Sequence, residues 1–176
     1  DPETDEERSF NDFVDLLYDE EGFRRSVYKD TKDNPTVGLG HLLTASELKE
    51  YKVGDTWADE NLLNTTRKDI RDKWNAAKTQ AQELGIDDTD FIVSLGSVNF
   101  QLGENWFEDH DKTWALLKAG KYEEAIKEAA RSQWYRDTPD RVVAFQRAIR
   151  KLMDAQSPSI LRRPDPESRL TSTFGI

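Results

Sequence analysis

Apolar side chains recur at near-helical spacing shortly after a charged start of the chain. They are Phe10, Phe13, Val14, Leu16 and Leu17. This pattern predicts a first helix that ends at Gly22, because glycine readily adopts the backbone conformation that closes a helix. Residues 1–9 are mostly polar and charged, so we expect them to form a leader or linker with a frayed end.

Two short β-prone runs follow the first helix. Residues 26–28 and 35–40 are separated by the polar stretch 29–34. Two such runs around a polar turn predict a β-hairpin.

A long helix is predicted over residues 57–84. Thr56 and Asp59 have the spacing of a capping box at its start, and Gly85 is suited to end it. One apolar face runs along the segment and consists of Leu63, Ile70, Trp74, Ala77, Ala81 and Leu84.

The rest of the chain is expected to be helical in pieces, with Pro139 behind Thr138 as a favourable helix start. The predicted helices cover residues 89–101, 112–118, 122–132 and 139–153, and residues 157–176 are predicted to be an irregular tail. The fold class is therefore α+β. A small lobe (10–60) holds the hairpin, a helix (57–84) links the lobes, and a helical lobe (85–156) follows. A cleft between two lobes is a common place for a site.

Composition excludes several function classes. The chain has 35 acidic and 25 basic residues and a net charge of −10, which argues against nucleic-acid binding. No stretch reaches the roughly 20 apolar residues of a membrane span, so no membrane insertion is expected. Cysteine is absent and the two histidines are far apart, so no metal site and no cofactor are expected. The excess of acid lies in residues 1–60, whereas residues 131–176 are net basic.

One run of residues carries candidate chemistry. Hydrolysis of a glycosidic bond generally needs a carboxylic acid that protonates the leaving oxygen, and a second group that activates water or attacks the sugar. Glu21–Gly22 stands at the predicted helix end, Asp30 follows nine residues after the Glu, Thr36 six residues after the Asp, and Gly38–His41 has the form Gly-x-Gly-His. This run resembles the signature of the small lysozymes of tailed bacteriophages, glycoside hydrolase family 24.

Two downstream segments extend the resemblance. Residues 99–104, Asn-Phe-Gln-Leu-Gly-Glu, are similar to the family's cleft segment on the helical lobe. Residues 134–141 are similar to its Trp-Tyr…Thr-Pro-x-Arg motif. The resemblance therefore covers about residues 10–153.

The resemblance implies catalytic roles for three residues. Glu21 would be the general acid, and a carboxyl group that faces a cleft at a helix end can lose water contact, which favours its protonated form. Glu20 is the rival, and the Glu-Gly pattern favours Glu21. Asp30 would carry negative charge beside the sugar or orient water, and Thr36 would hold the attacking water.

Residues next to this run have structural interpretations. Gly38 and Gly40 would allow a tight strand close to the cleft. The resemblance implies an ion pair between His41 and Asp69, and we favour that structural role over a catalytic one.

Substrate contacts are also implied by the resemblance, and the expected residues are Leu42, Phe100, Gln101, Thr113 and Glu128. Two positions depart from the T-even phage enzyme, which has Asn where this chain has Glu128 and Arg where it has Gln133.

The expected function is hydrolysis of the β-1,4 bond between N-acetylmuramic acid and N-acetylglucosamine in bacterial peptidoglycan, with inversion. Two alternatives stay open, a lytic transglycosylase and a catalytically silent wall-binding module. A bacteriophage enzyme of this kind would be made in the host cytoplasm and act on the wall, as a monomeric domain that is virion-associated or released at lysis.

Overall fold

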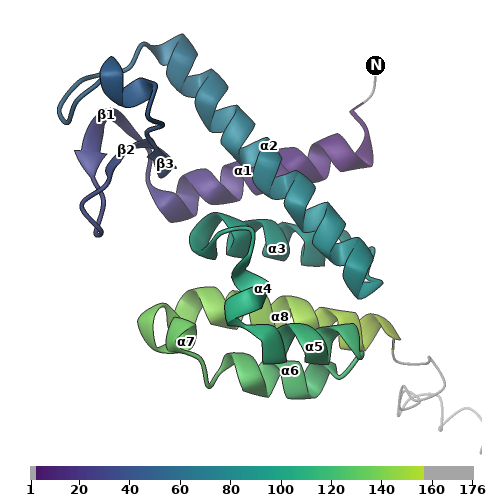
Figure 1. Cartoon of the computed structure of the whole chain (residues 1–176). Coiled ribbons are helices and arrows are strands. Elements are labelled where there is room, and N and C mark those ends of the chain that lie inside the picture. The colour runs from purple at the N-terminus through teal and green to yellow at the C-terminus, as the bar shows by residue number, and fades with distance from the viewer. Residues whose placement is uncertain (1–2, 157–176) are drawn as a thin grey trace, which may run out of the picture.

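The computed structural model describes residues 3–156, and these fold into two lobes joined by one long helix (Figure 1). The small sheet lies at one end of helix α2, and the later helices lie together around its other end. The predicted α+β class is confirmed. The irregular tail expected at residues 157–176 lies outside the described residues.

Helix α1 (Asp5–Glu21) begins earlier than the apolar spacing indicated. The Thr4 hydroxyl accepts from the Glu7 amide, and the Glu7 carboxylate accepts from the Thr4 amide, which completes a capping box. Residues 5–9, which were expected to belong to a leader or linker with a frayed end, are therefore part of this helix. The helix ends before Gly22, whose φ of 68° favours glycine.

The small lobe is built on a three-stranded antiparallel sheet. Its strands are β1 (Arg24–Lys29), β2 (Pro35–Gly38) and β3 (His41–Leu42), in that order. The predicted hairpin is confirmed, whereas the two-residue third strand was not predicted. In the register of the sheet, Thr36 stands between Tyr28 and Leu42. A short 3-10 turn, η1 (Glu47–Lys49), follows the sheet.

Helix α2 (Asp59–Leu84) links the two lobes. The predicted capping box at its start is wrong, because the N-cap residue is Ala58 and no side chain caps the helix. The Thr56 hydroxyl instead pairs with the Ser26 hydroxyl at 2.9 Å, where an isolated bridge fastens this segment to β1. The predicted end is confirmed, since Gly85 is left-handed and its amide donates to helix carbonyls.

Six helices follow α2 in the described chain, two more than the sequence predicted. The additions are the short helices α4 and α7; Ser132 caps α7 rather than ending the helix before it. The six are α3 (Thr89–Leu102), α4 (Trp106–Asp109), α5 (Asp111–Lys118), α6 (Tyr122–Ala129), α7 (Gln133–Asp137) and α8 (Pro139–Gln156).

Helix α3 occupies the centre of the molecule, in contact with α1 and α2 on one side and with α8 on the other (Figure 1). Trp74 of α2 packs on Phe10 and Phe13 of α1, and Trp106 and Trp134 are buried in the helical lobe. Within residues 3–156 no helix is long and apolar enough to cross a membrane.

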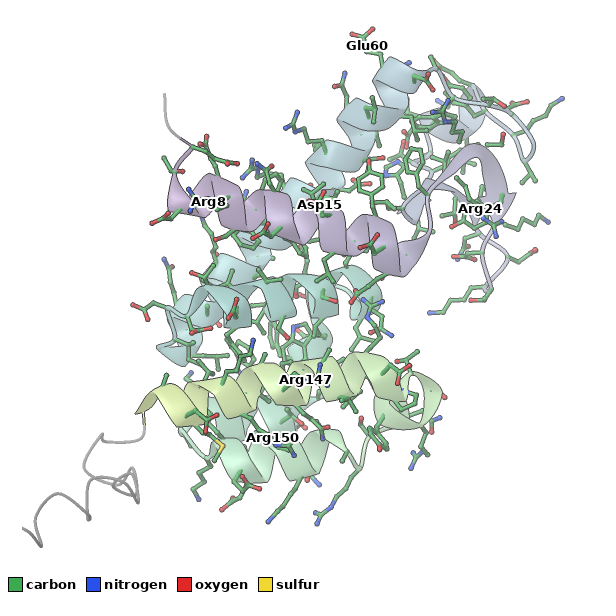
Figure 2. All side chains as sticks on the ribbon, turned by 180° about the vertical axis from the view of Figure 1, so that it is seen from behind. Arg8, Asp15, Arg24, Glu60, Arg147 and Arg150 are labelled. Carbon is green, nitrogen blue, oxygen red and sulfur yellow. The ribbon has the colours of Figure 1, made fainter. Side chains whose placement is uncertain are left out.

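Charged side chains lie along the outer faces of the helices. Figure 2 shows Arg8 and Asp15 on α1, and Arg147 and Arg150 on α8, all of them exposed. Helix α1 is strongly acidic, whereas helix α8 has more basic than acidic residues.

Candidate active site

Glu21 is the last residue of α1, and its carboxylate forms an ion pair with Arg141 of α8. Arg141 Nη1 donates to Glu21 Oε1 at 2.8 Å, and Arg141 Nη2 lies 3.3 Å from Glu20 Oε2. The Ser97 hydroxyl of α3 donates to Glu20 and accepts from Arg141. One guanidinium therefore pairs with two adjacent carboxylates, and its contacts connect α1, α3 and α8 at the end of α1.

A pocket of about 230 Å³ lies beside this ion pair. Glu20, Ser97 and Arg141 belong to its lining, as do Gln101 and Trp134. Glu20 therefore lines this pocket, whereas Glu21 does not.

Asp30 organises the turn between β1 and β2. Its Oδ1 accepts the backbone amides of Lys32 at 2.9 Å and Asn34 at 2.8 Å. The turn also contains Asp33 with a φ of 66°, a conformation that Asp tolerates better than most residues. Two backbone donors on one carboxylate oxygen therefore fix the orientation of the Asp30 side chain.

Thr36 is joined to Asp30 through Asn34. The Thr36 hydroxyl donates to the Asn34 carbonyl at 2.8 Å, and the Asn34 amide donates to Asp30. Because a carbonyl cannot donate, this hydroxyl keeps its lone pairs free to accept from another group. Thr36 is buried on the central strand, so its position is set by the sheet.

The expected contact between His41 and Asp69 is present, and a second carboxylate joins it. His41 Nδ1 lies 2.7 Å from Asp69 Oδ2, and His41 Nε2 lies 2.8 Å from Glu47 Oε1. The hydrogen bond to Asp69 is the main reason that the pKa of His41 rises to about 9, against the opposing effect of burial. Burial raises the pKa of Glu47, but hydrogen bonds from Thr44 and His41 outweigh it and leave this pKa lowered.

We expect His41→Asn to destabilise the fold more than it slows the folded protein. A charged His41 stabilises the native state fully below pH 6.5, and this contribution is lost as pH rises through about 9. The cost should be about 2 kcal/mol near pH 6, after allowance for solvent screening, and should shrink toward pH 9.5. Denaturant unfolding at both pH values measures it. A large rate loss at unchanged stability would contradict the structural role.

Glycine is favoured at positions 38 and 40 for different reasons. A Cβ on Gly38 would lie 3.0 Å from Thr66 Oγ1 and 3.3 Å from a Leu62 methyl, at a φ of 68°. Gly38 therefore lets the sheet approach α2. Gly40 has a φ of 99° and open space around it, so its backbone conformation alone favours glycine.

The residues expected to contact sugar lie on both lobes. Leu42 of β3 is 55% exposed, which is high for a leucine. Phe100 of α3 is half-buried and packs against the hydrophobic cluster that contains Phe13 of α1. Gln101 uses both ends of its amide inside the protein. It accepts from Trp134 Nε1 and donates to the Thr138 hydroxyl, each at 2.9 Å. This pairing leaves Gln101 less free to bind a sugar than the sequence indicated.

Thr113 and Glu128 line a different pocket, in the helical lobe. Its volume is about 570 Å³, and Trp134 belongs to its wall as well as to that of the pocket beside Arg141. Of the predicted substrate residues, Gln101 lines the pocket beside Arg141, and Thr113 and Glu128 line this second pocket.

Sequence reasoning missed Arg141 and Glu47. Arg141 is the last residue of the Thr-Pro-x-Arg motif, and this motif could have indicated that Arg141 belongs to the site. Glu47 is six residues from His41 and had no periodic or motif signal. Among residues 3–156, no group of three or more acidic, His or Cys side chains is arranged to hold a metal ion.

A small sheet, a long linking helix and a helical lobe, with carboxyl groups at the end of α1 and in the first sheet turn, define a lysozyme-like α+β protein. The chain belongs to the phage lysozyme family, which matches residues 18–151.

Three relatives illustrate the range of the family. The chain is 30% identical over 138 residues to the peptidoglycan hydrolase gp36 of Pseudomonas phage phiKMV, covering 78% of this chain and 15% of that protein. It is 26% identical over 147 residues to the probable T4-type lysozyme 2 of Dictyostelium discoideum, covering 72% and 86%. It is 24% identical over 157 residues to the pre-baseplate central spike protein Gp5 of Enterobacteria phage T4, covering 73% and 26%. The chain thus spans a small part of both phage relatives.

Proposed function

We propose that this chain is a muramidase that hydrolyses bacterial peptidoglycan between N-acetylmuramic acid and N-acetylglucosamine, with Glu21 as general acid. The observation that carries the proposal is the linked turn of Asp30, Asn34 and Thr36, which offers a fixed carboxylate and a hydroxyl free to accept. The names of the phiKMV and Dictyostelium relatives support the same substrate.

Glu21 would act as the general acid from the end of α1, where Glu21 and Glu20 share the Arg141 guanidinium. The protonated carboxyl would protonate the glycosidic oxygen as the bond to the leaving sugar breaks.

Thr36 and Asp30 would serve the other side of the reaction. Water that donates one hydrogen to Thr36 keeps a lone pair for attack on the anomeric carbon. The Asp30 carboxylate would stabilise the positive charge that develops on the sugar ring. Leu42 and Phe100 would provide apolar contact with the glycan from the two lobes.

Direct attack by water predicts inversion at the anomeric carbon. Inverting glycosidases hold their two groups roughly 6.5–9.5 Å apart, which leaves room for the water. We expect the first product from the β-linked glycan to have the α configuration, observed by NMR before mutarotation. An initial β product would contradict this mechanism.

The biological role that fits is degradation of the host wall by a bacteriophage. A relative that is named as a central spike protein supports a virion-associated domain, with release at lysis as the alternative. The partner would be the wall polymer, and the protein would be made in the host cytoplasm and act as a monomeric domain.

A further inference from the structure

Both sides of the proposed glycan site are attached to helix α2 within one helical turn. On the small-lobe side, His41 of β3 lies 2.7 Å from Asp69 of α2. On the other side, Lys73 of α2 contacts α3 and the turn that follows it. Asp69 and Lys73 are four residues apart, so they are neighbours on one face of α2. One turn of this helix therefore holds both the strand that carries Leu42 and the helix that carries Phe100.

Lys73 holds the helical-lobe side through its main chain and through its side chain. The Asn99 side-chain amide donates to the Lys73 carbonyl at 3.2 Å, and Asn99 directly precedes Phe100 in α3. The Lys73 ammonium group lies 3.3 Å from Glu104 Oε1, just beyond the end of α3. The chain is thus attached to the same residue of α2 before and after Phe100.

A buried amide pair strengthens this attachment. Gln80 of α2 donates through Nε2 to Asn99 Oδ1 at 2.8 Å and to the Glu104 carbonyl at 3.0 Å. The Trp106 indole donates to Gln80 Oε1 at 3.4 Å, and both amide side chains are buried. Because a displacement of α3 along α2 would leave these buried polar groups unpaired, the network favours a single position of α3.

We propose that Lys73 is a positioning residue of the glycan site, and that it sets the separation between Leu42 on the small lobe and Phe100 on the helical lobe. The inference rests on the proposed function, because it concerns the binding of the same glycan. Groups that bind one ligand from two sides must be held within about 0.5 Å of the productive geometry. Lys73 acts through Asn99 and Glu104, without contact with the substrate.

The test uses the wild type, Lys73→Met, the charge exchange of Lys73→Glu with Glu104→Lys, and the control Lys68→Met. Lys68 is a cation of the same helix, and its side chain is 78% exposed. Hydrolysis of soluble, uncrosslinked glycan strands gives KM and kcat, and thermal melting checks the folding. The sequence has no cysteine, so Lys49→Cys and Arg136→Cys can carry one spin label on each lobe at exposed positions. The distance between the labels is then measured without substrate.

We expect Lys73→Met to raise KM about two- to fivefold, the range that one partly exposed ion pair contributes, while kcat changes less. The distribution of distances between the two labels should broaden. The charge exchange should restore the wild-type KM and the wild-type distribution, because it rebuilds the ion pair with opposite polarity. Lys68→Met should match the wild type in both measurements.

A raised KM that the charge exchange does not reverse would mean that Lys73 contacts the glycan directly, and it would overturn the positioning role. A lower melting temperature with unchanged KM and unchanged label distances would also overturn it, since the ion pair would then only stabilise the fold. If the wild type hydrolysed no glycan while the label distances responded as expected, the proposed function would fail and the control of lobe separation by Lys73 would stand.

Discussion

Glu21→Gln is expected to lower peptidoglycan hydrolysis by about 10²–10⁴-fold while the protein remains folded. The amide keeps the shape of the side chain but has no acidic proton to deliver, and general acid catalysis contributes this much. The fold should persist because Arg141 keeps its pair with Glu20 and its hydrogen bond to Ser97. Release of reducing ends measures the activity, and circular dichroism measures the folding.

Two further variants make this result specific. Asp19→Asn changes an exposed carboxylate of the same helix and should act as the wild type does. Glu20→Gln should retain activity within about tenfold, since Glu20 would assist only by sharing Arg141. Near-normal activity of Glu21→Gln together with loss in Glu20→Gln would assign the acid to Glu20 instead.

Trp74→Ala is expected to cost about 3–5 kcal/mol of stability, which is the usual range for removing a buried tryptophan. Trp74 is 2% exposed and its ring packs on Phe10 and Phe13, so it holds α1 against α2. Chemical denaturation measures the loss. Because α1 presents Glu21, activity at raised temperature should fall in parallel.

The control is Trp74→Phe, which keeps most of the ring. The indole nitrogen of Trp74 is buried without a hydrogen-bond partner, so its removal sacrifices no bond and the cost should be about 1–2 kcal/mol. Trp134→Phe, by contrast, removes the donor to Gln101 Oε1 and leaves that oxygen unpaired. If Trp74→Phe were as damaging as Trp74→Ala, packing would not be the source of the stability.

Periodic and turn signals predicted the parts of the fold that depend on local sequence. The apolar face of α2 and Gly85 after it located that helix end, and the β-prone runs around residues 29–34 located the hairpin. The start of α1 could also have been predicted from local sequence, since Thr4 and Glu7 have capping-box spacing. It was missed because residues 1–9 are mostly charged and show no apolar periodicity. Helices α4 and α7, at four and five residues, are too short to show periodicity.

Long-range partners could not be predicted in this way. Arg141 meets Glu21 from 120 residues away, and only the packing of α3 between α1 and α8 brings them together. Glu47 joins His41 because η1 folds back on β3, a path that residue spacing does not encode. The resemblance to a known family supplied the His41–Asp69 contact, but not the second carboxylate.

We propose that the protein hydrolyses the glycan at muramic acid with water as nucleophile. The most direct test is mass spectrometry of the products from purified peptidoglycan digested in heavy-oxygen water. We expect fragments that end in reducing N-acetylmuramic acid and carry one heavy oxygen at the new end. Fragments that end in 1,6-anhydro-muramic acid, or no soluble fragments at all, would contradict it.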